Sequence, residues 1–473
     1  MSLSGPSLPG SCLLINIGRI RTRECHGVGR RALLHAGSLS ALGFSLPQLL
    51  ALEDAGRRAG ITESPRAKSV ILLWLWGGPS HIDTFDMKPE APVEYRGPYR
   101  PVDTAVPGLQ ICELLPQLAK RADRYSVIRS LHCSSNDHGI AGTIGLTGSD
   151  RGATSLGGQV LPGRLEPTHG SIVSRVMGLS AGTPRFVAIG DALHQGHRTI
   201  SGEGGGKLGP IYDPFQVNYI PSQGVRIPNL ELADDLQPSR IENRRALLTG
   251  IDSLARQYEH AASVKRIDSF YEQAFSMLTS NESRDMFQLD PEPETLRRRY
   301  GRFRFGQCCL MARRLVEAGV RFVQVNWSAH VEPVEDTGDG GWDMHDRYFQ
   351  QYQDRHSWML DQAASALLDD LEQRGLLSET IVVAVGEFGR TPKINAKSGR
   401  DHWNQCYSAI VAGGGLRTGQ IIGASDERAE HPILMPLTPA DLFTTVLQQI
   451  GITTPRLTDV GLAPLGEAIE ALM

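Results

Sequence analysis

The chain has 473 residues, with 48 Lys and Arg against 52 Asp and Glu, so its formal net charge is −4. At roughly 100–200 residues per domain, this length predicts two or three domains, or one large α/β domain with insertions. The slightly acidic balance, without basic blocks, argues against a nucleic-acid binder, which would carry a stripe of Lys and Arg. Seven cysteines, none of them spaced C-x-x-C, exclude a disulfide scaffold and a zinc ribbon.

The first sixty residues have the pattern of an export signal. Arg30 and Arg31 precede a moderately apolar stretch that has no Asp, Glu, Lys or Arg before Glu53. This pattern predicts a leader over 1–62, export through the twin-arginine machinery, and a periplasmic or cell-envelope location. Gly, Ser, Pro and Gln dilute the stretch below the ~20 apolar residues of a stable membrane span. No clean A-x-A site follows, so cleavage, retention as a tether and a true start near Val28 all stay open.

The remaining residues, 66–473, alternate strand-like and helical patterns. Residues 70–76 and 380–385 are continuous apolar runs, which are typical of parallel strands buried on both faces. Residues 305–318 place apolar side chains at three- and four-residue spacing and end at Gly319, as a core-facing helix does. This order of strands and helices predicts an α/β domain whose mostly parallel sheet carries helices on both faces.

Other segments extend this pattern. A long helix is predicted over 345–374, and Thr438 is expected to cap the start of another helix. The range 149–300 begins with a high density of Gly and Pro and becomes charged and helical later, so we interpret it as an insertion that caps the sheet. Further strands are predicted over 125–131, 320–325 and 407–412.

Polar residues gather where the predicted strands end. Ligands bind at the carboxyl ends of strands in such sheets, so we expect these side chains to share one site. His, Asp and Glu without thiolates suit a divalent ion such as zinc or manganese, which lowers the pKa of bound water. For any single residue, the alternative is a loop cap or a salt-bridged surface group. The residues are His81, Asp83, Asp86, His132, Asn136, Asp137, His138, Asp343, His345, Glu387, Asp401 and His402.

These side chains lie in motifs that resemble a known family. From Lys68 to the C-terminus, the chain resembles the alkaline phosphatase and sulfatase superfamily, and more narrowly its exported bacterial branch, domain-of-unknown-function family 1501. The resemblance implies an alkaline-phosphatase-like fold, a dinuclear metal site and attack on sulfate or phosphate esters. The motifs are LWGGPSHIDTFD (75–86), ARRLVEAGV (312–320), WDMH (342–345), EFGRTP (387–392), GRDH (399–402), GGG (413–415) and TPAD (438–441).

The resemblance also implies the ligands of a divalent metal ion, which is zinc, manganese or calcium. Phe388 stands where the superfamily has a further histidine, which leaves one well-bound ion or a second ion held weakly by carboxylates. The superfamily's first ligand corresponds to about Gly77, so Asp83 or Asp86 has to reach back from its loop to replace it. The implied ligands are Asp83, Asp343, His345, Glu387 and His402.

His138 stands where the superfamily has its Ser, Thr or Cys nucleophile. A histidine there is expected to act as a base on metal-activated water, to form a phospho-imidazole, or to become another ligand. His132 is an alternative base, and Thr143 and Ser135 are alternative nucleophiles. We therefore expect His138 to be a catalytic residue.

Arg390 follows Glu387 closely and is expected either to clamp an oxyanion or to form an ion pair with Asp343 or Glu387. The sequence therefore predicts an exported, metal-dependent hydrolase of a small-molecule or glycan ester, with His138 and Arg390 as its catalytic residues. The alternatives are a binding protein that has lost catalysis, which Phe388 favours, and a different metal-assisted transfer on an extracellular glycan or envelope lipid.

Overall fold

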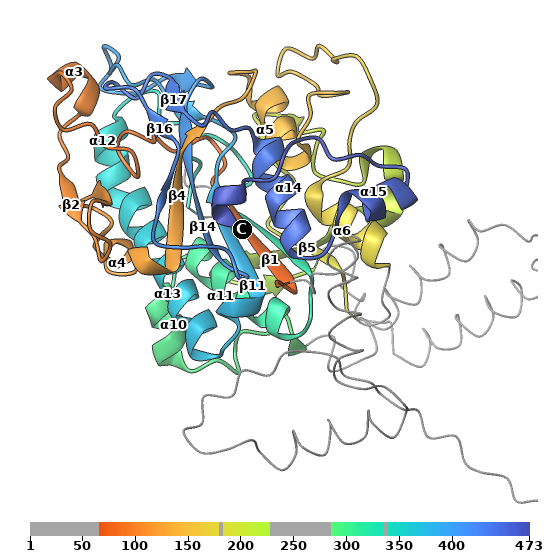
Figure 1. The fold of residues 1–473 in the computed structure, drawn as a ribbon. Helices are drawn as coiled ribbons and strands as arrows, with labels where there is room; N and C mark the ends of the chain where they lie inside the picture. Colours follow the sequence, from red (N-terminus) through yellow and green to blue (C-terminus); the bar gives the residue numbers. More distant parts are fainter. Residues whose placement is uncertain (1–65, 179–182, 228–284, 334–338) are drawn as a thin grey trace, which may run out of the picture. The chain divides into compact units, whose positions relative to one another are not determined.

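The computed structural model describes residues 66–178, 183–227, 285–333 and 339–473. These residues build a nine-stranded sheet with helices on both of its faces (Figure 1). The strand order is β15-β4-β14-β11-β1-β10-β5-β8-β9, and five of the eight neighbouring pairs are parallel. The predicted α/β class with a mostly parallel sheet is therefore confirmed. The leader predicted over 1–62 lies outside the described residues.

The central strand is β1 (Ser69–Trp74), and its position between two cores explains why its sequence is apolar from Val70 onward. Ile71 and Leu73 pack into the core on one face of the sheet, whereas Leu72 and Trp74 pack into the core on the other. Because both faces are covered, the strand is apolar after Ser69, whose buried hydroxyl donates to the carbonyl of Val320 at 2.9 Å. The other strands of the sheet are β4 (Tyr125–Leu131), β5 (Phe186–Ile189), β8 (Phe215–Ile220), β9 (Gly224–Arg226), β10 (Phe322–Asn326), β11 (Thr380–Val385), β14 (Tyr407–Gly413) and β15 (Ile421–Ile422).

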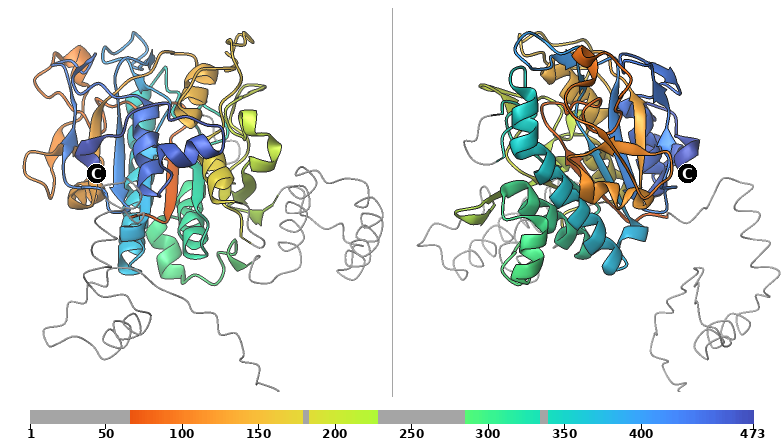
Figure 2. Two further views of the ribbon diagram at one scale, coloured as in Figure 1. Left: turned by 45° about the vertical axis from the view of Figure 1, so that its right-hand side comes forward. Right: turned by 90° about the vertical axis from the view of Figure 1, so that its left-hand side faces the viewer.

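The helices divide between the two cores (Figure 2). On the side of Ile71 and Leu73 lie α4 (Pro116–Ala119), α10 (Glu294–Tyr300), α11 (Arg304–Glu317) and α13 (Ser357–Gln373). On the other side lie α5 (His138–Thr147), α6 (His169–Met177), α14 (Pro439–Gln449) and α15 (Thr454–Asp459). Within the described ranges, no helix is both long enough and apolar enough to cross a bilayer.

The long helix predicted over 345–374 differs from the structure in a way that matters for the site. Helix α12 (Tyr348–Gln351) begins three residues later, because the backbone N–H of Tyr348 donates to the carbonyl of Ser398. A π-helical turn (Tyr352–His356) then separates α12 from α13. His345 therefore lies in the loop before the helix and is free to face the end of the sheet.

The range 149–300, predicted to be an insertion that caps the sheet, also contributes strands to the sheet itself. Strands β5, β8 and β9 from its described part join the main sheet, and β5 pairs in parallel with β10. The apolar run of β5 has only four residues, and the Gly- and Pro-rich segments around it hide it in the sequence. Its neighbours in the sheet are β10 and β8, so this part of the chain extends the sheet.

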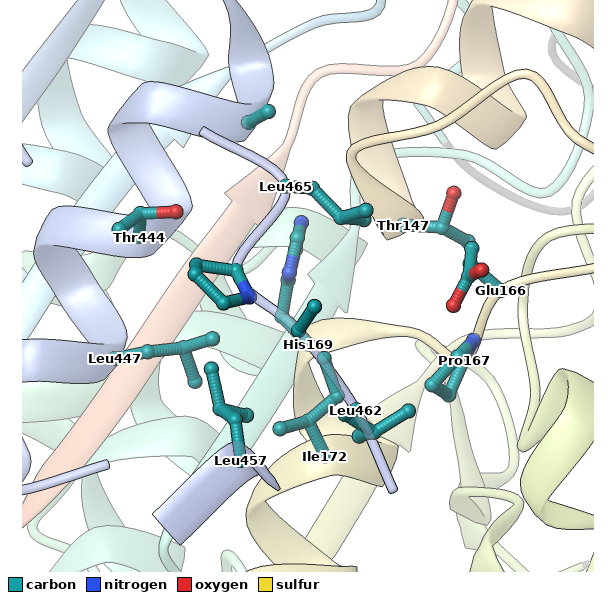
Figure 3. Close-up of a pocket in the computed structure, with 13 residues that line it drawn as sticks. Thr147, Glu166, Pro167, His169, Ile172, Thr444, Leu447, Leu457, Leu462 and Leu465 are labelled. Carbon is teal, nitrogen blue, oxygen red and sulfur yellow. The ribbon is translucent and has the colours of Figure 1, made fainter. Parts of the chain in front are cut away.

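A small cavity lies between α6, α14 and the segment that contains Leu457–Leu465 (Figure 3). Its free volume is about 20 Å³, enough for one water molecule. His169 lines the cavity and stacks on Phe443, with ring centroids 3.8 Å apart. Neither ring nitrogen of His169 forms a hydrogen bond within the described ranges, and burial lowers its pKa to about 3. The imidazole is therefore neutral, and a polar neighbour, the backbone of Gly145, raises its pKa without forming a hydrogen bond of normal geometry.

The variant His169→Leu is expected to raise the free energy of unfolding by about 1 kcal/mol, because an unsatisfied buried polar group costs about 1–3 kcal/mol. Urea denaturation of the two proteins measures the change. Leu447→Ala alters an apolar wall of the same cavity and should instead destabilise by about 2–5 kcal/mol. A loss of stability in His169→Leu would mean that an ordered water satisfies the imidazole.

Candidate metal centre

The site lies at the carboxyl ends of the central strands. His138 opens α5 after β4, Glu387 follows β11 directly, and Asp343 and His345 lie between β10 and α12. His402 comes from a small hairpin of β12 (Gly389–Arg390) and β13 (His402–Trp403), which also carries Arg390. The parallel strands bring these segments, which are far apart in the sequence, to one edge of the sheet.

Three histidines converge on the carboxylate of Asp343. Nε2 of His345 lies 2.9 Å from Asp343 Oδ1, and Nε2 of His402 lies 3.0 Å from the same oxygen. Nε2 of His138 lies 3.4 Å from Asp343 Oδ2. One ligand atom each from His138, Asp343 and His402 all lie within 4.8 Å of one another. Three imidazole nitrogens and one carboxylate form a donor set that suits zinc or a similar divalent ion.

Each of these imidazoles is held through its other ring nitrogen. All three partners are oxygen acceptors, so Nδ1 carries the proton of each neutral ring and Nε2 turns its lone pair toward Asp343. Metal-binding histidines are oriented by hydrogen bonds of this kind. The partners are Glu387 Oε1 for His138 (2.6 Å), Asp401 Oδ1 for His345 (2.7 Å) and the Asn136 carbonyl for His402 (2.7 Å).

The positions of the Nε2 atoms fit a cation. Nε2 of His345 and Nε2 of His402 face each other at 2.9 Å, and two lone pairs at that distance repel unless a cation or a proton lies by them. Nε2 of His138 is buried and forms no hydrogen bond of normal geometry within the described ranges. A divalent ion beside Asp343 would relieve the repulsion and satisfy these nitrogens.

The local electrostatics act differently on the individual donors. Burial raises the pKa of Asp343, but Arg390 and the three nearby histidines outweigh burial and hold that pKa far below its usual range. Burial lowers the pKa of His402 to about 4, and the nearby His138 and Arg390 lower it too. Asp343 is therefore ionised and His402 neutral at pH 7. Asp343 raises the pKa of His345, and Asp343 and Glu387 outweigh burial to raise that of His138, so metal binding competes with a proton at these two rings.

Glu387, a predicted ligand, lies behind His138. Its fully buried carboxylate accepts hydrogen bonds from the backbone N–H of Gly77, at 3.0 Å to Oε1 and 3.2 Å to Oε2. Oε1 is also the partner of His138 Nδ1. Glu387 thus orients the ring of His138. Carboxylates pair with metal-binding histidines in this way at many metal sites.

Asp83, also a predicted ligand, forms a buried ion pair with Arg400. Its oxygens accept hydrogen bonds from Arg400 Nε at 2.6 Å and Arg400 Nη2 at 3.0 Å, and from the Ser80 hydroxyl at 2.6 Å. Both side chains of the ion pair are fully buried. The structure does not bring Asp83 into the group of converging ligand atoms, and its ion pair instead anchors the loop that leads to His402.

Gly77, the position expected for the superfamily's first ligand, has no room for a side chain. It has φ of 108°, and a Cβ atom there would lie 2.5 Å from the backbone nitrogen of Trp342 and 2.6 Å from that of Asp343. The backbone N–H of Trp342 also donates to the carbonyl of Trp76. Glycine therefore lets the segment that carries Asp343 pass close to the end of β1.

Arg390 takes the second of its two predicted roles, the ion pair. Its fully buried guanidinium places Nη2 2.8 Å from Asp343 Oδ1. Nε donates to the carbonyl of Gly78 at 2.9 Å, Nη1 donates to that of Arg400 at 3.3 Å, and Nη2 also donates to that of Gly77. Arg390 therefore fixes Asp343 in place.

The alternative nucleophiles have local structural roles. The Thr143 hydroxyl donates to the Gly139 carbonyl within α5, and Ser135 Oγ accepts the backbone N–H of Asp137.

Asp401 is the residue whose role the sequence did not assign, although it adjoins His402 in the GRDH motif. Its pKa is lowered by His345 against the effect of burial, which is consistent with an ionised partner of that ring.

A family model described as a protein of unknown function (DUF1501) matches residues 67–463. The chain belongs to this DUF1501 family. The membership expected from the motifs is confirmed. No curated protein matches this DUF1501 protein.

Several solved structures resemble this DUF1501 protein at low identity. Ps i-CgsB in complex with k-i-k-neocarrahexaose has a TM-score of 0.41 and 11% identity, covering 85% of this chain and 75% of that one. The PsFucS1 sulfatase from Pseudoalteromonas sp. has a TM-score of 0.33 and 14% identity, with coverages of 89% and 73%. The phosphonate monoester hydrolase SpPMH from Silicibacter pomeroyi has a TM-score of 0.36 and 11% identity, with coverages of 85% and 76%.

Proposed function

We propose that this DUF1501 protein is a metal-dependent hydrolase of sulfate or phosphate esters. The observation that carries the proposal is the convergence of three histidine Nε2 atoms on the ionised Asp343 at the carboxyl edge of the sheet. Asp343, His345 and His402 would hold a divalent ion, and the imidazoles favour zinc or manganese over calcium. Such an ion polarises an ester oxygen and lowers the pKa of water in the site.

His138 is the proposed base. Glu387 holds the Nδ1 proton of His138, so Nε2 is the atom that accepts a proton from the attacking water. The new bond joins the water oxygen to sulfur or phosphorus, the bond to the alcohol oxygen breaks, and His138 returns its proton to that alcohol. The buried carboxylate of Glu387 stabilises the imidazolium that forms in between.

A second function follows if His138 is instead a ligand. Catalytic zinc sites use three protein ligands and keep a position open, whereas structural sites are closed by four. Nε2 of His138 lies in the group of ligand atoms within 4.8 Å and has no other partner there, which favours a closed site. In that case the protein is a metal- or ligand-binding member of its family without turnover.

The variant His138→Ala separates the two functions. With His138 as the base, hydrolysis of aryl sulfates or aryl phosphates should fall about 10²- to 10⁴-fold while elemental analysis finds the metal content unchanged. Assays with and without a chelator establish that turnover needs the ion. Loss of the metal together with the absence of turnover in the wild type would contradict the hydrolase and support the closed site.

We also propose a periplasmic or cell-envelope location for the protein, and a small-molecule or glycan ester as its substrate. The support for export is the pattern of Arg30 and Arg31 ahead of an uncharged, moderately apolar stretch. Export through the twin-arginine machinery would carry the chain already folded and loaded with metal.

A further inference from the structure

The buried charges around Asp343 bear on which anions the site accepts. Asp343 and Glu387 together carry two negative charges, and Arg390 carries one positive charge; at most 7% of any of these side chains is exposed. An imidazole that binds a metal ion or acts as a base is neutral, so the metal-loaded chain contributes +1 − 2 = −1 to the site, and the single divalent ion changes this to +1. The nearby pair of Asp83 and Arg400 is neutral and does not alter the sum.

Arg390 itself supplies one positive charge beside Asp343, so the charge count includes only one metal ion. Oδ1 of Asp343 is shared by Arg390, His345 and His402, and the guanidinium of Arg390 takes one side of it, where a second cation would otherwise lie. The carbonyls of Gly77 and Gly78 beside it accept hydrogen bonds from the same guanidinium. Arg390 thus stands as a built-in cation on the β1 side of Asp343.

On the basis of the proposed function, we propose that the site holds one divalent ion and selects monoanionic esters over dianionic ones. The favoured substrate classes are sulfate monoesters and phosphate diesters, and the disfavoured class is phosphate monoesters. A site with net charge +1 is neutralised by a monoanion, whereas a dianion leaves one unbalanced charge in a buried environment. Such a charge interacts strongly where the effective dielectric constant is low, and it should cost at least about tenfold in affinity. Asp401 also faces the site, but 53% of its side chain is exposed and solvent screens its charge.

The test compares two non-hydrolysable anions of the same shape, benzenesulfonate and phenylphosphonate, at pH 8.5, where the second is a dianion. Calorimetric titration of the metal-loaded full chain should show benzenesulfonate binding at least about tenfold more tightly. Elemental analysis of the same sample should find one ion per chain. Two ions per chain, equal or tighter binding of phenylphosphonate, or no binding of either anion would overturn the proposal.

The variant Glu387→Gln removes one buried negative charge with little change of shape. It should move the ratio of the two affinities at least about tenfold toward phenylphosphonate, with one ion per chain retained. Glu379→Gln is the matched control, because Glu379 precedes the opposite end of β11 and its side chain is 44% exposed; its ratio should stay at the wild-type value. An unchanged ratio in a folded Glu387→Gln protein would contradict the charge count.

Turnover assays distinguish a failure of this proposal from a failure of the proposed function. The substrates are 4-nitrophenyl sulfate, methyl 4-nitrophenyl phosphate and 4-nitrophenyl phosphate. A preference for 4-nitrophenyl phosphate would overturn the charge selection and leave the hydrolase intact. Hydrolysis of none of the three, with benzenesulfonate still bound more tightly than phenylphosphonate, would overturn the hydrolase and support the charge selection.

Discussion

The variant Asp343→Asn is expected to lose the metal ion and, with it, all measurable ester hydrolysis. The carboxylate is the common partner of three histidines and Arg390, and its charge is what attracts a cation to the site. Removing residues that merely orient ligands costs about 10–100-fold in metal affinity, so removing a ligand should cost more than about 100-fold. Elemental analysis after dialysis and an aryl-ester assay measure the two effects.

The control is Asp401→Asn, which makes the same change in a carboxylate that contacts the proposed ligand His345 instead of the ion. Asp401 holds Nδ1 of His345, so this variant should weaken metal binding by about 10–100-fold and keep measurable turnover with excess metal. If Asp343→Asn bound the ion as tightly as Asp401→Asn does, Asp343 would not be a ligand.

The variant Asp83→Ala is expected to lower the free energy of unfolding by about 3–5 kcal/mol, because it leaves the guanidinium of Arg400 buried without its partner. The folded protein should still bind one ion, since the structure keeps Asp83 out of the converging ligand atoms. Urea denaturation and elemental analysis at low temperature measure the two quantities.

Removing both charges of the pair tests whether the loss of stability comes from the unpaired guanidinium of Arg400. The double variant Asp83→Ala with Arg400→Met should recover much of the lost stability, because replacing a buried ion pair by apolar groups is often close to neutral. A stable Asp83→Ala protein that has lost its metal would contradict this account, and it would support the role of Asp83 as a ligand that the sequence predicted.

Much of the fold could be predicted from local patterns. The run over 70–76 indicated a strand buried on both faces, and the two cores on either side of β1 show that this is so. The segment from Thr438 indicated a helix start, and the structure shows a capping box with Asp441. Such patterns do not reveal strand direction, so β14, a predicted strand, could not be recognised as antiparallel to its neighbours β11 and β4.

The candidate site was predictable in its residue types but not in its contacts. Asp343, His345 and His138 were identified because each follows a predicted strand, and the structure brings them together with His402, whose GRDH motif precedes one. Asp83 has the same kind of position, but its partner Arg400 is 317 residues away in the sequence. Pairings over such separations depend on the folded backbone, and no local pattern encodes them.

The most direct test of the account is X-ray absorption spectroscopy at the metal edge of the loaded, full-length chain. It should show one type of site, with imidazole nitrogens and a carboxylate oxygen around the ion at about 2.0–2.2 Å for zinc. His402→Ala should remove one imidazole from that spectrum, because His402 Nε2 lies 3.0 Å from Asp343 Oδ1. A bound ion without imidazole ligands, or a spectrum that His402→Ala leaves unchanged, would contradict the account.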